Sequence, residues 1–222
     1  MQFADRADAG RVLARALQHL AGRHDIIVLA LPRGGVPVGY EIARALSAPL
    51  DIFTVRKLGV PGQEELAMGA VASGGVRVLN EEVVAALGQH AATAIAEATT
   101  RESAELRRRE DQYRGARPFP DLTGKTVVLV DDGLATGATM RAAARAVRQR
   151  QPARLIIAVP VAAESTCREI EAEADEVVCA VIPEAFFGVG QFYENFGQTS
   201  DEEVRALLEQ AGGAAIAESP NE

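Results

Sequence analysis

Two adjacent carboxylates, Asp131 and Asp132, follow the apolar run Val127–Val130 and precede a loop of small residues. A short β-branched run of this kind predicts a strand that is buried on both faces. Carboxylates at the end of such a strand can accept hydrogen bonds from two vicinal hydroxyls, or they can hold a hydrated divalent cation. The segment therefore predicts a site for a ligand that carries a sugar diol.

The loop after these carboxylates has the composition of a phosphate site. Its small residues let a ligand approach the backbone, and Thr136 and Thr139 add hydroxyl donors. The N–H groups at the start of the following helix favour an anion. An ordinary strand-to-helix turn with a threonine cap is the simpler interpretation. The acidic pair and the T-G-x-T loop together favour a ligand site formed by Asp131, Asp132, Gly133, Ala135, Thr136, Gly137, Ala138 and Thr139.

This segment resembles the phosphoribosyl pyrophosphate (PRPP) signature of the type I phosphoribosyltransferases (PRTases), which is four apolar residues, two acidic residues and a loop ending T-G-x-T. The resemblance implies that Asp131 and Asp132 hold the ribose hydroxyls, and that the segment Ala135–Thr139 wraps the 5′-phosphate. It also implies Mg²⁺ at Asp131 and Asp132, bound through water or through PRPP. Ala135 stands where the hypoxanthine-guanine branch has a third aspartate, so the loop is more similar to that of the adenine branch.

Another glycine-bearing loop, Leu31–Pro37, follows a predicted strand at Ile26–Leu31 and opens a helix. Its glycines let backbone N–H groups face an anion, and Arg33 adds positive charge. A glycine pair before a helix is common, so this loop alone is weak evidence for an anion site. The evidence is stronger because the T-G-x-T loop offers a second phosphate site in the same predicted sheet. In the resembling family this loop binds pyrophosphate, often through a cis peptide that is not before proline. We therefore assign pyrophosphate to Arg33, Gly34 and Gly35, and we expect a cis bond before Arg33 or Gly34.

Paired cations, Arg56 and Lys57, follow the predicted strand Asp51–Val55. Lys57, helped by Arg56, can neutralise a departing pyrophosphate; a solvated basic turn is the alternative. The polar segment Val60–Glu65 comes next and predicts a mobile loop that closes over the reaction. Glu65 is either a proton acceptor or a surface residue.

Five aromatic residues fall within Pro183–Phe196, although aromatic residues make up only 5% of the chain. They can stack on a flat base, and the resembling family usually builds a hood over the acceptor from such a segment. Alternatively, they seal a minor core. The basic run Arg107–Arg109 alternates with acidic residues, which is typical of a solvated helix face; an RNA-reading surface on a PRPP-sensing regulator is the rival interpretation.

Composition narrows the classes of function. The 222-residue chain can bury one sizeable core, and its net charge of −8 argues against a nucleic-acid or membrane binder. Cys167 and Cys179 show no metal-ligand spacing and are expected to be free thiols. Free thiols, together with the lack of a signal-peptide pattern, predict a cytoplasmic protein.

Strand and helix patterns alternate along the chain, which predicts an α/β fold with a doubly wound, mainly parallel sheet like that of the type I PRTases. We expect a single domain at 1–211, with a helical insertion at 81–117, a small C-terminal hood at 183–200 and a flexible tail at 212–222. Ligands gather at the carboxyl ends of parallel strands, so both glycine loops should open onto one crevice. The insertion is expected to cap the fold or to form a homodimer.

The resemblance implies a phosphoribosyltransferase of nucleotide salvage. It would transfer 5-phosphoribosyl from PRPP to a nitrogen of a purine-like nucleobase and release pyrophosphate, with Mg²⁺ bound. The catalytic residues would be Asp131, Asp132, Lys57 and Arg33. A non-catalytic regulator that senses PRPP or nucleotide is the alternative. A receiver-type phosphoacceptor would explain the aspartates but not the T-G-x-T loop.

Overall fold

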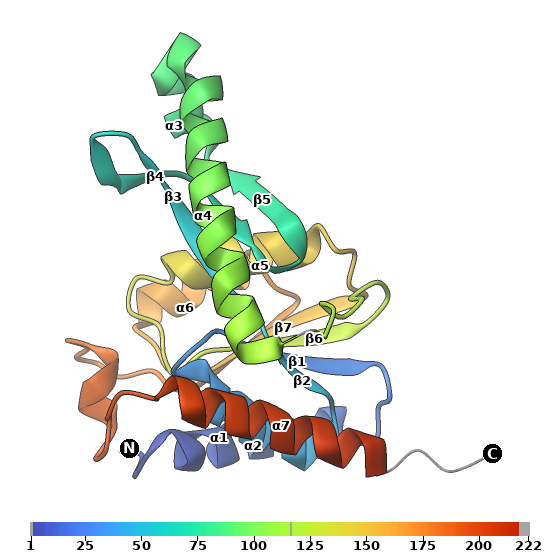
Figure 1. The fold of residues 1–222 in the computed structure, drawn as a ribbon. Helices are drawn as coiled ribbons and strands as arrows, with labels where there is room; N and C mark the ends of the chain where they lie inside the picture. The colour runs from blue at the N-terminus through green and yellow to red at the C-terminus, as the bar shows by residue number, and fades with distance from the viewer. Residues whose placement is uncertain (1, 116, 218–222) are drawn as a thin grey trace.

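A parallel sheet of five strands lies at the centre of the computed structural model, which describes residues 2–115 and 117–217 (Figure 1). The strand order is β2-β1-β6-β7-β8. The bounds are β1 Ile26–Ala30, β2 Leu50–Ile52, β6 Thr126–Val130, β7 Arg154–Val161 and β8 Glu176–Val181. β1 and β6 are buried along their whole length, as their continuous apolar runs predict.

Helices cover both faces of this sheet, so the predicted doubly wound α/β fold is confirmed (Figure 1). On one face pack α1 Arg6–Ala16, α2 Gly35–Leu46 and α7 Asp201–Ala217. On the other pack α5 Ala138–Arg148 and α6 Glu164–Glu171. Each layer buries its own apolar cluster against the sheet.

A second, antiparallel sheet and a long helix form a separate layer beside the main sheet (Figure 1). The strands are β3 Val55–Val60, β4 Gln63–Ala72 and β5 Val76–Leu79, followed by α3 Glu81–Leu87 and α4 Ala91–Arg114. α4 packs on β3 and β4 through an apolar cluster that includes Leu58, Met68 and Ile95. Gly88 separates the two helices: it has a φ of 55° and begins a short 3-10 turn, Gly88–His90.

Three segments differ from the sequence-based expectation. The predicted strand Asp51–Val55 divides between β2, which ends at Ile52, and β3, which begins at Val55, because the chain leaves the main sheet for the second sheet between them. Arg56 and Lys57 therefore lie within a strand.

The segment Val60–Glu65, expected to be a loop, is the tip of the β3–β4 hairpin, and Val60 pairs with Gln63 across it. The loop pattern misled because Pro61 and Gly62 form a two-residue turn within it. The last helix, α7, continues to Ala217 and so enters the expected tail at 212–222; residues 218–222 lie outside the described residues.

Cys167 and Cys179 were expected to be free thiols, and the structure contradicts this by joining them as a disulfide. Cys167 lies on α6 and Cys179 on β8, and both belong to the apolar cluster between these two elements. The packing of α6 against β8 brings the two sulfurs together, which spacing along the chain does not reveal. Among the described residues, no helix has the length and apolarity needed to cross a membrane.

Candidate active site

The two glycine-bearing loops leave neighbouring strands at the same edge of the sheet. Ala30 at the end of β1 pairs in register with Val130 at the end of β6. The N–H of Leu31 then donates to the carbonyl of Val130 at 2.8 Å, so the two chains part just before each loop begins. The two loops therefore begin at consecutive positions of two adjacent strands.

The first loop is the one after β1, and the second is the one after β6. The glycines of the first loop are needed because this loop lies directly against the acidic pair. A β-carbon at Gly34 would overlap the carboxylate of Asp132, and one at Gly35 would lie 2.8 Å from the carbonyl oxygen of Val130. The peptide bond between Pro32 and Arg33 is cis, as predicted. Only glycine permits this approach of backbone to side chain.

Both carboxyls of the acidic pair are partly buried, and one braces the other. The N–H of Asp132 donates to Oδ1 of Asp131 at 2.9 Å. Burial, and next the nearby charge of Asp132, raise the pKa of Asp131 well above its ordinary value. Burial also raises the pKa of Asp132, although the guanidinium of Arg6 opposes this shift. Ionisation of the pair is therefore unfavourable in the ligand-free protein, and hydrogen bonds from the hydroxyls of a ligand would make it less so.

Arg6 is a component of the site that the sequence analysis missed. Its Nε donates to Oδ2 of Asp132 at 2.8 Å, and its Nη1 donates to the carbonyl of Gly197 at 2.6 Å. Its guanidinium carbon lies 4.1 Å from the ring centroid of Phe196. Asp5 caps α1 through the N–H of Asp8, so Arg6 is the first helical residue. Nothing local in the sequence showed that this helix start faces Asp132.

The second loop presents exposed backbone and hydroxyls where it enters α5. Gly137 has a φ of 68° and caps the helix, and Thr136 and Thr139 are exposed. The hydroxyl of Thr166 donates to the carbonyl of Ala135 at 2.9 Å, which holds the loop from behind. Gly133 lies against Val189, so a larger residue would collide with the hood segment. The remaining small residue of this loop, Ala138, forms the first turn of α5.

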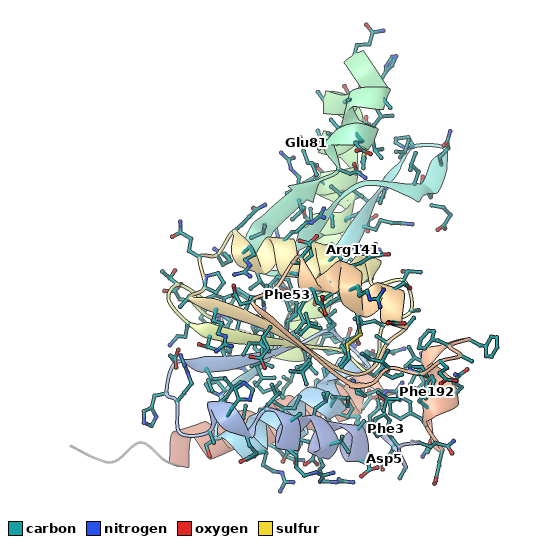
Figure 2. The ribbon with its side chains drawn as sticks, turned by 180° about the vertical axis from the view of Figure 1, so that it is seen from behind. Phe3, Asp5, Phe53, Glu81, Arg141 and Phe192 are labelled. Atoms are coloured by element: carbon teal, nitrogen blue, oxygen red, sulfur yellow. A yellow bond between two sulfur atoms is a disulfide. The ribbon has the colours of Figure 1, made fainter. Side chains whose placement is uncertain are left out.

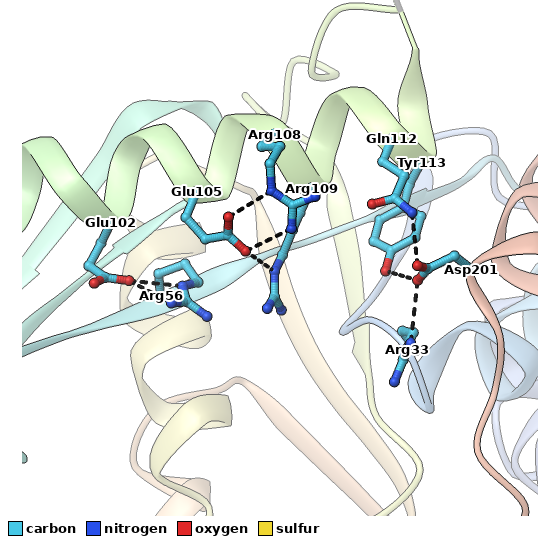
Figure 3. Close-up of polar contacts among 9 residues, drawn as sticks. All are labelled: Arg33, Arg56, Glu102, Glu105, Arg108, Arg109, Gln112, Tyr113 and Asp201. Carbon is cyan, nitrogen blue, oxygen red and sulfur yellow. Dashed lines mark hydrogen bonds and ion pairs between the residues drawn. The ribbon is translucent and has the colours of Figure 1, made fainter.

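The two predicted cations diverge. Lys57 lines a cavity of about 230 Å³ together with Ala138 and Thr139, and so faces the second loop. Its Nζ lies 3.3 Å from Oε2 of the fully exposed Glu65. Arg56 instead points to α4, where its Nη2 donates to Oε2 of Glu102 at 2.7 Å (Figure 3). Neighbouring residues of a strand face opposite sides, which explains the divergence.

The aromatic segment serves two purposes. Phe192 and Tyr193 are buried with Phe3 in a minor core (Figure 2), and the Tyr193 hydroxyl donates to the carbonyl of Asp132 at 2.6 Å. This part fulfils the core interpretation. Phe187, by contrast, is 92% exposed and Phe196 is 38% exposed, so these two rings are accessible to a ligand.

A sequence model of the phosphoribosyl transferase domain matches residues 4–196. The chain belongs to this family. Two proteins of Mycobacterium tuberculosis, from strains CDC 1551 / Oshkosh and ATCC 25618 / H37Rv, are both named "Putative phosphoribosyl transferase". Each is 50% identical over 210 residues, which cover 94% of this chain and 47% of the relative. The chain therefore spans about half the length of these relatives.

Among solved structures, TT1426 from Thermus thermophilus superposes with a TM-score of 0.85 at 44% sequence identity. The match covers 95% of this chain and 99% of TT1426, so both sheets and the helical insertion are shared. Family membership and this fold confirm the resemblance that the segment Val127–Met140 carried at the level of sequence.

Proposed function

We propose that this protein transfers 5-phosphoribosyl from PRPP to a nitrogen of a purine-like nucleobase and releases pyrophosphate. One observation carries the proposal: the acidic pair lies between two glycine-bearing loops at the ends of adjacent strands. PRPP has a phosphate on C5, a diol at C2 and C3 and a pyrophosphate on C1, so a single molecule can engage both loops and the acidic pair.

The ribose and its 5′-phosphate would be held by residues after β6. The carboxylates of Asp131 and Asp132 accept hydrogen bonds from the 2′- and 3′-hydroxyls. The backbone N–H groups and hydroxyls of Thr136–Thr139 donate to the phosphate at the start of α5, where partial positive charge favours an anion. Arg6 keeps Asp132 in place through its hydrogen bond. These contacts fix the orientation of the C1′ carbon.

The pyrophosphate would leave toward the loop after β1. Negative charge builds up on the leaving group as the C1′–oxygen bond breaks, and Arg33, Lys57 and the N–H of Gly34 would stabilise it. The N–H of Gly35 already donates to the carbonyl of Leu31 at 3.0 Å, so Gly35 would contribute by leaving room for the ligand. The base nitrogen attacks C1′ from the opposite face, so the configuration inverts. The protein contributes positioning and electrostatic stabilisation rather than covalent chemistry.

The site offers two carboxylates to Mg²⁺. No cluster of three or more His, Cys, Asp and Glu side chains suited to a metal ion occurs in the described parts of the chain. Mg²⁺ typically keeps several waters and binds through one or two carboxylates plus substrate phosphates. Asp131 and Asp132 supply such a pair, directly or through water. The bound ion would neutralise charge on the departing phosphates.

The exposed rings of Phe187 and Phe196 belong to the hood segment and can stack on a flat base. Ala135 removes the acidic side chain of the hypoxanthine-guanine branch, which favours an adenine-like ring. Because Cys167 and Cys179 form a disulfide, free thiols no longer support a cytoplasmic location. We place the reaction in cytoplasmic nucleotide salvage on the basis of its class alone.

Mass-spectrometric detection of nucleotide after incubation with PRPP, Mg²⁺ and a panel of bases tests the proposal. We expect one or more purine-like bases to yield a nucleoside monophosphate, and Asp132→Asn to lose most of this turnover. Binding of PRPP without nucleotide formation from any base would identify a regulator instead. Failure to bind PRPP at all would refute both.

A further inference from the structure

A cavity of about 220 Å³ lies where the loop after β1 meets the long helix α4. Besides Pro32, its lining side chains come from that loop, from one face of α4 and from the first residue of α7: Arg33, Arg108, Arg109, Gln112, Tyr113 and Asp201. Three of these side chains are guanidinium groups, and the figure shows them on the same side of α4 (Figure 3). The helical insertion therefore contributes charge beside the residue that we assign to pyrophosphate.

The α4 arginines are paired but retain donors. Glu105 accepts from Nε of Arg108 and from Nε of Arg109, both at 2.8 Å. These hydrogen bonds lower the pKa of Glu105 to about 2. One carboxylate thus serves two guanidinium groups, each of which has five N–H donors. Arg108 and Arg109 are 62% and 44% exposed, so their remaining donors are accessible to an anion.

The third arginine can be released without leaving its partner unsatisfied. Nη1 of Arg33 lies 3.5 Å from Oδ1 of Asp201. Asp201 also accepts from the hydroxyl of Tyr113 at 2.6 Å and from Nε2 of Gln112 at 2.8 Å (Figure 3). If Arg33 turns to a ligand, the carboxylate keeps two good donors, so the exchange does not strand a partly buried charge.

We propose that Arg108 and Arg109 of α4, together with Arg33, bind the distal phosphate of pyrophosphate. This inference rests on the function proposed above and deepens it, because it gives the insertion a share in the leaving-group subsite. Three guanidinium groups face two carboxylates here, and the surplus positive charge complements a diphosphate. Arg33 exchanges Asp201 for the ligand, and the α4 pair adds donors from the opposite wall.

Calorimetric titration with two probes separates this inference from the function on which it rests. Inorganic pyrophosphate reports the leaving-group subsite, and ribose 5-phosphate reports the acidic pair and the second loop. We expect the double variant Arg108→Gln/Arg109→Gln to weaken pyrophosphate binding by about 10-fold or more, since charged hydrogen bonds are lost. Its affinity for ribose 5-phosphate should not change. Arg107→Gln is the control on the same helix. It removes one positive charge, against two in the double variant, from an exposed position that lines a different cavity.

Each other outcome has a definite meaning. Unchanged pyrophosphate affinity in the double variant would overturn the inference and leave the proposed function standing. Equal weakening by Arg107→Gln would show a general charge effect, and would overturn it as well. A wild-type protein that binds neither probe would refute the proposed function together with the inference. The thermal midpoint of each variant, expected to match the wild type, checks that folding is intact.

Discussion

Asp131, which we propose binds ribose, weakens the fold that carries it. Burial and the neighbouring Asp132 raise its pKa in the folded state. A raised carboxyl pKa means that the contribution of this group to stability is fully present below the ordinary pKa. That contribution is lost as the pH rises through the folded-state value. Above its ordinary pKa this carboxyl therefore lowers the stability of the ligand-free protein.

We therefore expect Asp131→Asn to stabilise the ligand-free protein near neutral pH by about 0.5–2 kcal/mol, in the range typical of relieved functional strain. The gain should vanish below about pH 3, where the wild-type carboxyl is protonated in both states. Urea unfolding across this pH range measures the difference. A gain that is independent of pH would contradict the assigned cause.

Arg6 influences the charge state of the other aspartate, Asp132. Its guanidinium lowers the pKa of Asp132 against the effect of burial. In Arg6→Met, the pKa of Asp132 should rise, so the acidic limb of PRPP binding should move to higher pH. Affinity near neutral pH should fall by about 10-fold, because a charged hydrogen bond to the site is lost. Titrations with PRPP at several pH values measure both effects.

Arg11→Met serves as the control for this variant, because Arg11 lies on the same helix and is 45% exposed. Its pH profile should match that of the wild type. A uniform loss of affinity in Arg6→Met at every pH would show that Arg6 only supports the hood, through Gly197 and Phe196.

The sequence predicted those site residues that lie within one local motif. Asp131, Asp132 and the two loops are recognisable because strand, turn and helix start follow one another directly. Arg6 and Asp201 were missed because they reach the site from helix starts that are remote in sequence. The Arg6–Asp132 contact, for example, spans 126 residues. No pattern of apolar residues encodes such a contact between polar side chains.

At the scale of elements, α4 is fixed to the main sheet by one buried arginine. Arg114 is 5% exposed; its Nε lies 3.1 Å from both carboxylate oxygens of Asp51, and its Nη2 donates to the carbonyl of Ile52 at 3.1 Å. Glu110 approaches it from the same helix at 3.3 Å. Arg114 thus ties the last turn of α4 to strand β2, next to the loop that carries Arg33.

Removal of this guanidinium should leave Asp51 without its cation. We expect Arg114→Met to reduce the free energy of unfolding by about 3–5 kcal/mol, as for other broken buried ion pairs. Arg107→Met on the same helix should change stability by less than about 0.5 kcal/mol. Adding Asp51→Leu to Arg114→Met should recover part of the loss. If the double variant were as unstable as the sum of two independent changes, the pairing would not be the cause.

The apolar patterns predicted β1 and β6 to within one residue at each end, and a helical stretch between 81 and 117. They did not predict that α4 crosses the β3–β4 hairpin and reaches β2, since this depends on the apolar cluster of Leu58, Met68 and Ile95. For the same reason the sequence did not show that Arg56 pairs with Glu102, which lies on that helix.

At the scale of the whole molecule, the N-terminal segment closes the hood. The N–H of Phe3 donates to the carbonyl of Phe192 at 2.8 Å, and the N–H of Glu194 donates to the carbonyl of Phe3 at 2.8 Å. The N–H of Asn195 donates to the carbonyl of Ala4 at 3.0 Å. The alternation of strands and helices predicted the doubly wound sheet, but a pairing between segments so far apart has no local signature.

A chain that begins at Asp5 should therefore keep its sheet and lose its hood. Asp5 still caps α1, whereas the three backbone hydrogen bonds and the buried ring of Phe3 are removed. We expect faster proteolytic cleavage within 183–200 and a raised KM for the base. Pyrophosphate affinity should not change, because Arg33 and α4 are untouched. Phe3→Leu in the full chain preserves the backbone pairing and most of the buried volume, so it should behave almost like the wild type. Cleavage at wild-type rates in the shortened chain would show that the hood is held by Tyr193 and Arg6 alone.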